Sequence, residues 1–280
     1  MDTKKALKWL AFWVGLAIIF NTGVYIFLGP QKALEFLGGY IIEQSLSVDN
    51  LFLFLLIFAS FGISAHYQRR VLNYGIMGAM ILRLVFIVLG VAVVNRFHWV
   101  LYIFGLLLII SGARMLLKRE GGQDFKNSAL LRMMGKVIPI THDLEGERFL
   151  IRKGKILYAT PLLAILVLIE GSDVIFAIDS IPAVFSITTD PLIVYSSNIF
   201  AILGLRNLYF LLEKLHRAFR FVKYGVAVIL IFTGVKLGIL YWHIEIPLVR
   251  SITTILAILL VSVLLSVFIP EKALAGKERS

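Results

Sequence analysis

Cysteine is absent from this chain of 280 residues, which excludes a disulfide framework, a thiolate metal site and a thiol nucleophile. Charged residues are scarce as well, at 16%, where soluble domains carry about 25%. Hydrophobic residues make up 59%, the mean hydropathy is +0.90, and they fall in long runs. Since a helix needs roughly 20 apolar residues to cross the hydrocarbon core of a bilayer, these runs predict an integral membrane protein.

Histidine supplies no soft-ligand cluster inside the membrane, because all five histidines fall in predicted connections or at span ends. They are His66, His98, His142, His216 and His243. Any buried metal ion would therefore be a hard cation held by oxygen. The net charge of +11 does not indicate nucleic-acid binding, since the basic residues lie between the spans, where they orient the chain in the bilayer.

The apolar runs predict an all-α, polytopic fold of about eight transmembrane helices. The expected spans are 7–28, 34–62, 71–94, 99–117, 156–187, 192–212, 224–242 and 248–268. Lys4, Lys5 and Lys8 at the start of the first span resemble the start of a signal peptide. Its apolar stretch is longer than a signal peptide needs and no small-residue cleavage site follows, so we expect a retained span.

Basic residues sort between the alternate connections, with 21 on one side and 3 on the other. The poorer side has Lys32, Arg96 and Arg250. The positive-inside rule then places both termini in the cytoplasm. The only long connection is 119–155, and it has an acidic group of Asp143, Glu145 and Glu147 beside His142. This group is either a metal site or a flexible charged face, and the flexible charged face is the favoured interpretation.

An internal repeat relates two parts of the chain, 40–50 and 170–180. Aligning Asp49 with Asp179 also aligns Glu43 with Asp173 and Asn50 with Ser180. Further along, Arg83 corresponds to Arg206, and Tyr102, Gly112 and Arg114 correspond to Tyr224, Gly234 and Lys236. We therefore expect one membrane domain over 1–280, with repeat one at 34–117, a cytoplasmic loop at 118–155, repeat two at 156–242 and a C-terminal span at 248–268.

Each repeat holds three spans, 2–4 and 5–7, so the second copy must enter the membrane inverted relative to the first. Inverted repeats of this kind are typical of secondary transporters, whose binding site lies near the midplane between the repeats. Spans 1 and 8 lie outside the repeats and are expected at the periphery.

Nine ionisable residues fall within the apolar spans. The carboxylates are Glu43, Asp49, Glu170, Asp173 and Asp179, and the basic residues are Arg83, Arg114, Arg206 and Lys236. Each would cost at least about 2.5–3.5 kcal/mol at a lipid-exposed helix centre, so the group must face an interior. An ion pathway is the favoured interpretation, with the basic residues as counter-charges, and a set of structural ion pairs is the alternative.

The spacing of the paired carboxylates limits how they bind an ion. Glu43 and Asp49 lie six residues apart, hence about 9 Å along a regular helix and on different faces. Gly38, Gly39, Ser45 and Ser47 in the first long span, and Gly171, Ser172 and Pro182 in the second, are compatible with a broken helix. A tilted, unbroken helix with a kink at the proline is the equal alternative.

Several motifs resemble those of the TerC family, and within it the Alx-like manganese exporters. They are GYIIEQSLSVDN at 39–50, YATP at 158–161, EGSDVIFAIDSIPAVF at 170–185 and TDPLIVYSSNIFAILGLR at 189–206. The resemblance implies efflux of Mn²⁺ across the bacterial cytoplasmic (inner) membrane, with Glu43, Asp49, Asp173 and Asp179 as ligands, assisted by Asn50 and Ser180. We place Glu170 on an access path, three residues before Asp173 and on the same helix face.

Other functions stay open beside the transporter. One is a membrane accessory protein that supplies metal to secreted enzymes, or a general role in metal or tellurium resistance. An enzyme is not expected, since we find no intramembrane Ser–His pair and no HExxH motif. Oxygen ligands also suit Mg²⁺, Ca²⁺ and Fe²⁺, and the oligomeric state does not follow from the sequence. The expected partners are a divalent metal ion and the lipid bilayer.

Overall fold

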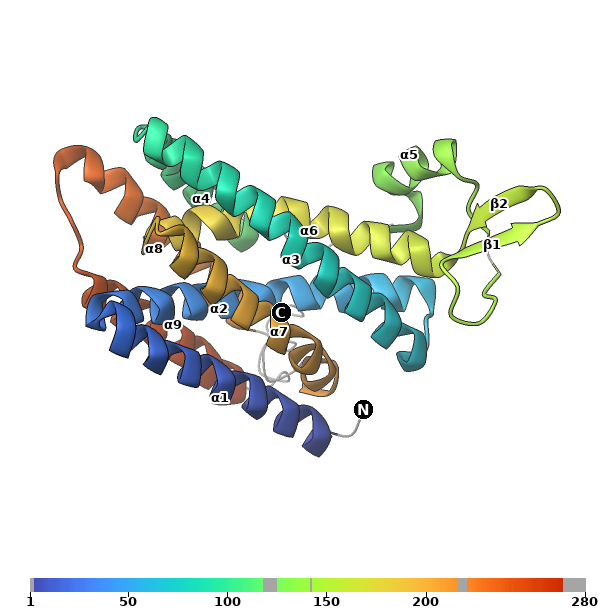
Figure 1. The fold of residues 1–280 in the computed structure, drawn as a ribbon, viewed down its shortest axis with the longest axis horizontal. Helices are drawn as coiled ribbons and strands as arrows, with labels where there is room; N and C mark the ends of the chain where they lie inside the picture. The colour runs from blue at the N-terminus through green and yellow to red at the C-terminus, as the bar shows by residue number, and fades with distance from the viewer. Residues whose placement is uncertain (1–2, 118–124, 142, 216–220, 269–280) are drawn as a thin grey trace, which may run out of the picture.

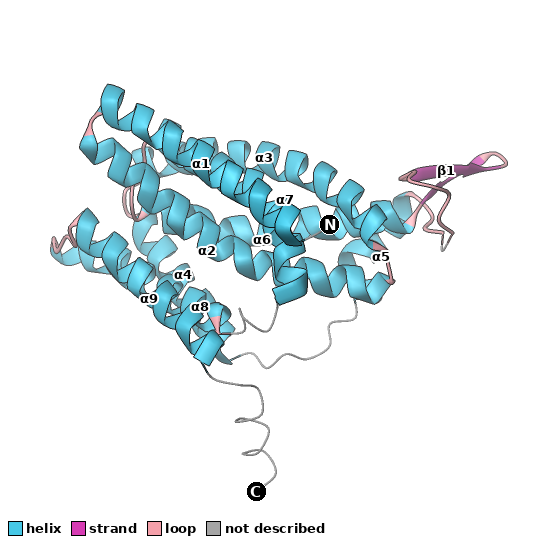
Figure 2. Cartoon of the chain, turned by 90° about the horizontal axis from the view of Figure 1, so that it is seen from below, coloured by secondary structure: helices cyan, strands magenta, loops and turns pink. Residues whose placement is uncertain are grey.

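The computed structural model describes residues 3–117, 125–141, 143–215 and 221–268, and it gives only the backbone of Thr3, Asp49, Asn127, Arg206, Lys214 and Leu215. Long helices run side by side along the molecule, and a small β-hairpin projects beyond one end of them (Figures 1 and 2). The chain is thus an all-α polytopic membrane protein, as predicted.

The elements follow one another along the chain in this order: α1 (Thr3–Leu28), α2 (Pro30–Phe61), α3 (Ala65–Arg96), α4 (Val100–Leu117), η1 (Phe125–Asn127), α5 (Ala129–Val137), β1 (Leu150–Lys153), β2 (Ile156–Ala159), α6 (Pro161–Phe185), α7 (Pro191–Leu215), α8 (Val222–Ile239), η3 (Leu240–Trp242) and α9 (Leu248–Phe268). Within the described ranges, seven helices are long and apolar enough to span a membrane, and α7 contributes a shorter apolar stretch, Pro191–Leu205.

Each predicted span falls on one of these helices, and 248–268 coincides with α9. The prediction was wrong at 156–159, where the chain forms strand β2 rather than the start of a span. These residues pair antiparallel with β1, with Leu150 opposite Ala159 and Lys153 opposite Ile156. Their apolar side chains continue the run of the following helix, which is why the sequence pattern alone joined them to it.

Local sequence explains where the central helices begin and end. Proline stands at the first position of α2, α6 and α7, where its missing N–H costs nothing and its fixed φ suits a helix. Gly62 ends α2 in the left-handed conformation, with φ at 63°, and its N–H bonds to the carbonyls of Phe58 and Ala59. Both α2 and α6 are continuous, so the unbroken alternative is confirmed, with Pro182 inside α6.

Helices of one predicted repeat pack on helices of the other. Helix α2 packs on α7 and α3 packs on α6, and α2 also packs on α6 and α3 on α7. Helix α1 packs against α2 and α7, and α9 packs against α8 and α2. Helices α2 and α6 run in opposite directions along the molecule (Figure 1). These partners are those that a two-fold axis between the predicted repeats would give. The inverted repeat itself stays a prediction.

Helices α4 and α8 approach each other through glycine. A Cβ at Gly105 would lie 2.8 Å from the Gly234 carbonyl oxygen, and one at Gly112 would lie 2.6 Å from that of Ala227. Such backbone contact is typical of helix pairs in membranes, where small residues permit close van der Waals packing. The predicted alignment of Gly112 with Gly234 also aligns Gly105 with Ala227. The two contacts are therefore equivalent under the repeat.

The 119–155 connection is more ordered than the predicted flexible loop in the part that the structure describes. It contains η1, α5 and strand β1, and Ile140 forms an isolated bridge with Ala159 of β2. Asp143 forms an ion pair with Lys153, and Glu147 contacts helix α3. His142 lies outside the described residues.

Candidate functional site

The centre of the candidate site is one buried arginine that joins two carboxylates from the two predicted repeats. Arg83 on α3 pairs with Glu43 on α2, and its Nε lies 3.9 Å from Asp173 Oδ2 on α6. The exposed fractions of the three side chains are 2%, 0% and 5%. Burying an ion pair is tolerated when both partners stay close and hydrogen-bonded, so this cluster fixes α2, α3 and α6 against one another.

Neutral groups complete the cluster. Arg83 Nη1 donates to Asn198 Oδ1 on α7 at 2.8 Å, and Ser47 Oγ donates to Glu43 Oε1 at 3.4 Å. The other Glu43 oxygen, Oε2, and Arg83 Nε are buried without a hydrogen-bond partner. We call Glu43, Arg83, Asp173 and Asn198 the Arg83 site; its two carboxylates and one guanidinium leave one net negative charge.

A small cavity of about 10 Å³ adjoins Asp173. Its lining comes from α2, α3, α6 and α7 and consists of Phe54, Leu72, Gly75, Ile76, Ala79, Ile169, Asp173 and Leu205. Asp173 is the only charged residue of this lining. The cavity therefore lies among the same four helices that meet at Arg83.

Asp179 lies on another face of α6. Its Oδ1 accepts a hydrogen bond from Ser111 Oγ on α4 at 2.7 Å. Asp173 and Asp179 are six residues apart on an unbroken helix and so point in different directions. The structure thus brings Glu43 together with Asp173, whereas Asp179 belongs to the α4–α6 contact.

The remaining predicted ligands differ in their surroundings. Asn50 and Ser180 are buried, and the Ser180 hydroxyl has no hydrogen-bond partner. The Glu170 carboxyl lies against the backbone of α3, in the space that a Cβ at Gly78 would occupy. Its Oε2 is likewise buried without a partner, so Glu170 is a half-buried acid one turn from Asp173.

Two predicted residues lie outside this description, because the side chains of Asp49 and Arg206 are not described. Among the side chains that are, no group of three or more His, Asp or Glu residues is placed to hold a metal ion. The expectation that Asp49 and Asp179 share one cation stays a prediction.

The two remaining basic residues do not join the acidic cluster. Lys236 on α8 is buried and donates to the Ser186 carbonyl at 2.6 Å and to Ser251 Oγ at 3.2 Å. Ser186 is the C-cap of α6, so the lysine charge meets the negative end of that helix. Arg114 is exposed in the last turn of α4.

Sequence reasoning did not assign Asn198, Ser111 or Gly78 to the site, and it named Ser47 only as a residue compatible with a broken helix. Two features of the sequence could have indicated two of these residues. Asn198 lies inside the segment that resembles the TerC family, and Ser47 lies one helical turn after Glu43. The pairing of Ser111 with Asp179 depends on which helices pack together, and no pattern within either span gives that.

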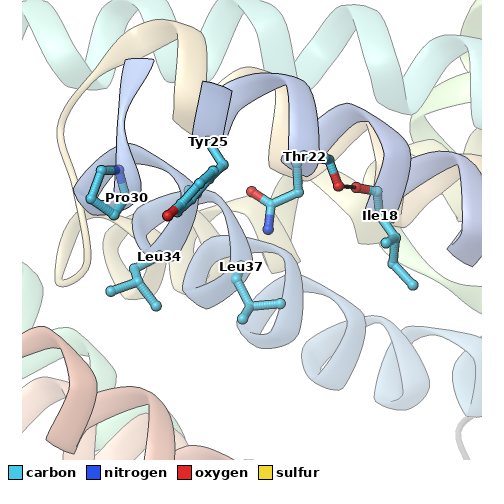
Figure 3. Close-up of a pocket in the computed structure, with 8 residues that line it drawn as sticks. Ile18, Thr22, Tyr25, Pro30, Leu34 and Leu37 are labelled. Carbon is cyan, nitrogen blue, oxygen red and sulfur yellow. Dashed lines mark hydrogen bonds between the residues drawn. The ribbon is translucent and has the colours of Figure 1, made fainter. Parts of the chain in front are cut away.

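A larger groove lies elsewhere, between α1 and α2. It encloses about 500 Å³ and is lined by Ile18, Asn21, Thr22, Tyr25, Pro30, Ala33, Leu34 and Leu37 (Figure 3). The Thr22 hydroxyl donates back to the Ile18 carbonyl of its own helix. This lining contains no carboxylate, so the groove does not suit a cation.

Comparison with known proteins places the chain in a family. Residues 28–274 match the integral membrane protein TerC family, so the chain belongs to that family and is a multi-pass integral membrane protein. It is similar to the "uncharacterized membrane protein STKORF319" of Myxococcus xanthus, at 44% identity over 94% of this chain and 82% of the relative.

Proteins named "putative membrane-bound redox modulator Alx" are also similar. Those of Escherichia coli K12 and Photorhabdus laumondii are each 42% identical over 96% of this chain and 86% of their own length. No solved structure matches the chain. The site geometry therefore carries the functional interpretation.

Proposed function

We propose that this protein is a secondary transporter that exports a divalent cation from the cytoplasm, with Mn²⁺ as the favoured ion. One observation carries the proposal: Glu43 and Asp173, from matched positions in two segments of the chain, converge on the buried Arg83. Ionisable groups this deep in a membrane protein are expensive and mark substrate or ion pathways. Carboxylate oxygens suit hard divalent cations such as Mn²⁺.

In this proposal Arg83 takes the place of the cation while the site holds none. An arriving cation competes with the guanidinium for Glu43 and Asp173, and Arg83 keeps its hydrogen bond to Asn198 on α7. When the cation leaves toward the outside, Arg83 or protons again neutralise the charge of the carboxylates. This exchange makes proton-coupled transport the natural mode for the site.

Asp179 with Ser111, and Asp49 at the matched position, supply the second part of the path in this proposal. The half-buried Glu170, whose carboxyl lies against the backbone of α3 at Gly78, serves as an access residue in this proposal. Mg²⁺, Ca²⁺ and Fe²⁺ fit the same oxygen ligands, so selection among the four depends on cavity size and ligand number.

The charge distribution supports an orientation with both termini in the cytoplasm, and the resemblance to the TerC family supports the bacterial inner membrane as the location. Reporter fusions at positions 136 and 218 should be cytoplasmic, and those at 190 and 245 external. If 136 and 218 lie on opposite sides, the inverted-repeat arrangement fails.

The rival function is an accessory protein that supplies metal to secreted enzymes. The Alx relatives are named for redox modulation, but this chain has no cysteine and so performs no thiol–disulfide exchange itself. Flux through the purified protein separates the transporter from the accessory, because only the transporter moves the ion without other proteins.

Purified protein in liposomes should move Mn²⁺ down an imposed gradient, detected by an entrapped metal-sensitive dye. Asp173→Asn should abolish this flux, whereas Asp143→Asn, which removes a carboxylate of the exposed connection, should preserve it. Absence of flux in the wild type would favour the accessory protein.

A further inference from the structure

Two ion-pair clusters lie at opposite ends of the four helices that meet at Arg83, and each cluster joins two of these helices. At the end where α2 begins, Lys32 Nζ lies 2.9 Å from Glu35 Oε2 and 2.9 Å from Asp190 Oδ2. The Thr188 hydroxyl donates to Glu35 Oε2 at 2.7 Å. We call these four residues the Lys32 clamp; it joins the start of α2 to the residue that precedes α7.

At the opposite end, Glu147 binds two residues in the first turns of α3. His66 Nε2 lies 2.8 Å from Glu147 Oε1, and Arg70 Nη1 lies 2.6 Å from Glu147 Oε2. The Arg70 guanidinium carbon also lies 5.4 Å from the centroid of the Phe149 ring. We call His66, Arg70 and Glu147 the Glu147 clamp.

The Glu147 clamp reaches the start of α6 through the backbone. Thr160, the N-cap of α6, donates its hydroxyl to the Arg148 carbonyl at 2.8 Å and its N–H to the Phe149 carbonyl at 3.0 Å. The segment around Glu147 is therefore bonded to the start of α6. Its hold on Arg70 ties the start of α6 to the start of α3.

The two clamps make equivalent connections under the predicted repeat, in which α2 matches α6 and α3 matches α7. Each one joins the first helix of one repeat to the second helix of the other. Along the helices, Lys32 precedes Glu43 by 11 residues and Arg70 precedes Arg83 by 13. At a rise of 1.5 Å per residue these intervals are about 16 and 20 Å, so the Arg83 site lies between the clamps.

We propose that the Lys32 clamp and the Glu147 clamp are the two gates of the transport path, which open in turn. This inference rests on the proposed transporter function and assigns the residues that control access to it. Both clamps are partly exposed, with 30% of the Asp190 side chain and 40% of that of Glu147 open to solvent. Ion pairs at this exposure are weak, which suits contacts that must break in every cycle.

The geometry gives the gates a mechanical basis. Alternating access moves one repeat against the other around a fixed site. Separating the start of α2 from that of α7 breaks the Lys32 clamp, and separating the start of α6 from that of α3 breaks the Glu147 clamp. Since α2 and α3 belong to one repeat and α6 and α7 to the other, the motion that separates one pair of helix starts presses the other pair together.

A thiol reporter tests this without any transport measurement. The chain has no cysteine, so Ala79→Cys places a single thiol in the lining of the cavity beside Asp173. Its reaction with a membrane-impermeant, negatively charged maleimide is measured in intact cells and in inverted vesicles. Asp190→Asn and Glu147→Gln are then compared, each in the Ala79→Cys protein.

Asp190→Asn should raise labelling from the outer, Lys32 side and lower it from the inner side, and Glu147→Gln should do the reverse. The expected change is about two- to fivefold, as for a two-state equilibrium that loses one partly exposed ion pair. Asparagine can still accept the N–H of Leu192, so the start of α7 is kept. Asp190→Glu and Glu147→Asp, which retain the charges, should behave as the parent does.

Two controls remove a charge without touching a clamp. Glu245→Gln changes the α8–α9 connection and Asp143→Asn breaks the Lys153 pair of the exposed connection; both should leave the two rates unchanged. If Asp190→Asn does not accumulate, Lys32→Gln breaks the same pair from α2. Equal rates in all variants, or a shift toward the same side in both, overturn the proposal.

The labelling and the flux measurements together distinguish a failure of the gating proposal from a failure of the proposed function. Opposite shifts in a protein that moves no Mn²⁺ in liposomes would keep the gates and remove the proposed function. Mn²⁺ flux in a protein whose labelling does not shift would keep the function and remove the gates.

Discussion

Arg83 and Lys236 are both basic and buried within membrane-spanning helices, yet their surroundings differ. Arg83 is held by Glu43, Asp173 and the Asn198 amide among α2, α3, α6 and α7. Lys236 is held by neutral oxygens, the carbonyl at the end of α6 and the Ser251 hydroxyl of α9. A buried cation thus serves an acidic cluster in one region and caps a helix in the other.

The difference divides the molecule by role. The four central helices carry the acidic groups and the clamps, whereas α4, α8 and α9 are joined by glycine contacts and the lysine cap. Matched position in the repeat alone does not fix the role of a charge, since the capping Lys236 aligns with the exposed Arg114.

The largest expected effect comes from removing the arginine. Arg83→Gln leaves two buried carboxylates without their cation and should lower the free energy of unfolding by about 3–5 kcal/mol. Lys236→Gln keeps a hydrogen-bond donor for Ser186 and should cost about 1–3 kcal/mol. Thermal unfolding of the purified protein in detergent measures both.

Adding Glu43→Gln to Arg83→Gln should recover part of the loss, because it removes one unpaired charge. No such recovery is expected when Glu43→Gln is combined with Lys236→Gln. Equal coupling in both pairs would erase the contrast between the two regions. We further expect Arg83→Gln and Arg206→Gln to shift the pH profile of transport, and an unchanged profile in both would make them structural.

The next largest effect concerns transport, which should distinguish the three aspartates from Glu170. Asp49→Asn, Asp173→Asn and Asp179→Asn keep the size of each side chain and remove its charge, so folding should survive while export fails. Glu170→Gln should be milder, since we place it on the access path. The measure is cellular manganese content under Mn²⁺ load at equal membrane abundance, and full export in the aspartate variants would remove the site.

Three glycine substitutions compare the packing of the two regions. Gly105→Ala meets a backbone carbonyl of α8 that cannot yield, and overpacking of this kind costs about 1–3 kcal/mol. Gly78→Ala meets the Glu170 side chain, which can rotate away, so its cost should be smaller and transport should change. Gly15→Ala meets nothing within 4 Å and should be neutral or stabilising. Equal unfolding temperatures for the three would contradict this order.

The smallest effect concerns the Lys32 clamp. Partial burial raises the pKa of Asp190, but the hydrogen bond and charge of Lys32 outweigh it and hold that pKa below its ordinary value of 3.8. The stabilisation is therefore present above the unfolded pKa and is lost as the pH falls through the folded one. Asp190→Asn should cost about 0.2–1 kcal/mol, constant between pH 8 and 5 and vanishing in stronger acid. A cost that already fades near pH 6 would contradict the assignment.

The sequence predicted the spans well because the thickness of the bilayer demands a long apolar run for each one. It also singled out Glu43, Asp173 and Arg83 as charges inside the spans, and the structure brings these three together; their role in binding a metal ion stays a prediction. It did not predict that Asp179 faces Ser111, because that depends on the packing of α6 against α4. The β2 strand was missed for a different reason, as Ile156 and Leu157 extend the apolar pattern of α6.

Equilibrium binding of Mn²⁺ to the purified protein tests the central claim most directly. Electron paramagnetic resonance of the free ion would be compared for the wild type, the Glu43→Gln/Asp173→Asn protein and Asp143→Asn, whose change lies in the acidic group of the 119–155 connection. The account predicts binding by the wild type and by Asp143→Asn, and its loss in the double variant. Binding that survives in the double variant and disappears in Asp143→Asn would contradict it and place the metal in that connection.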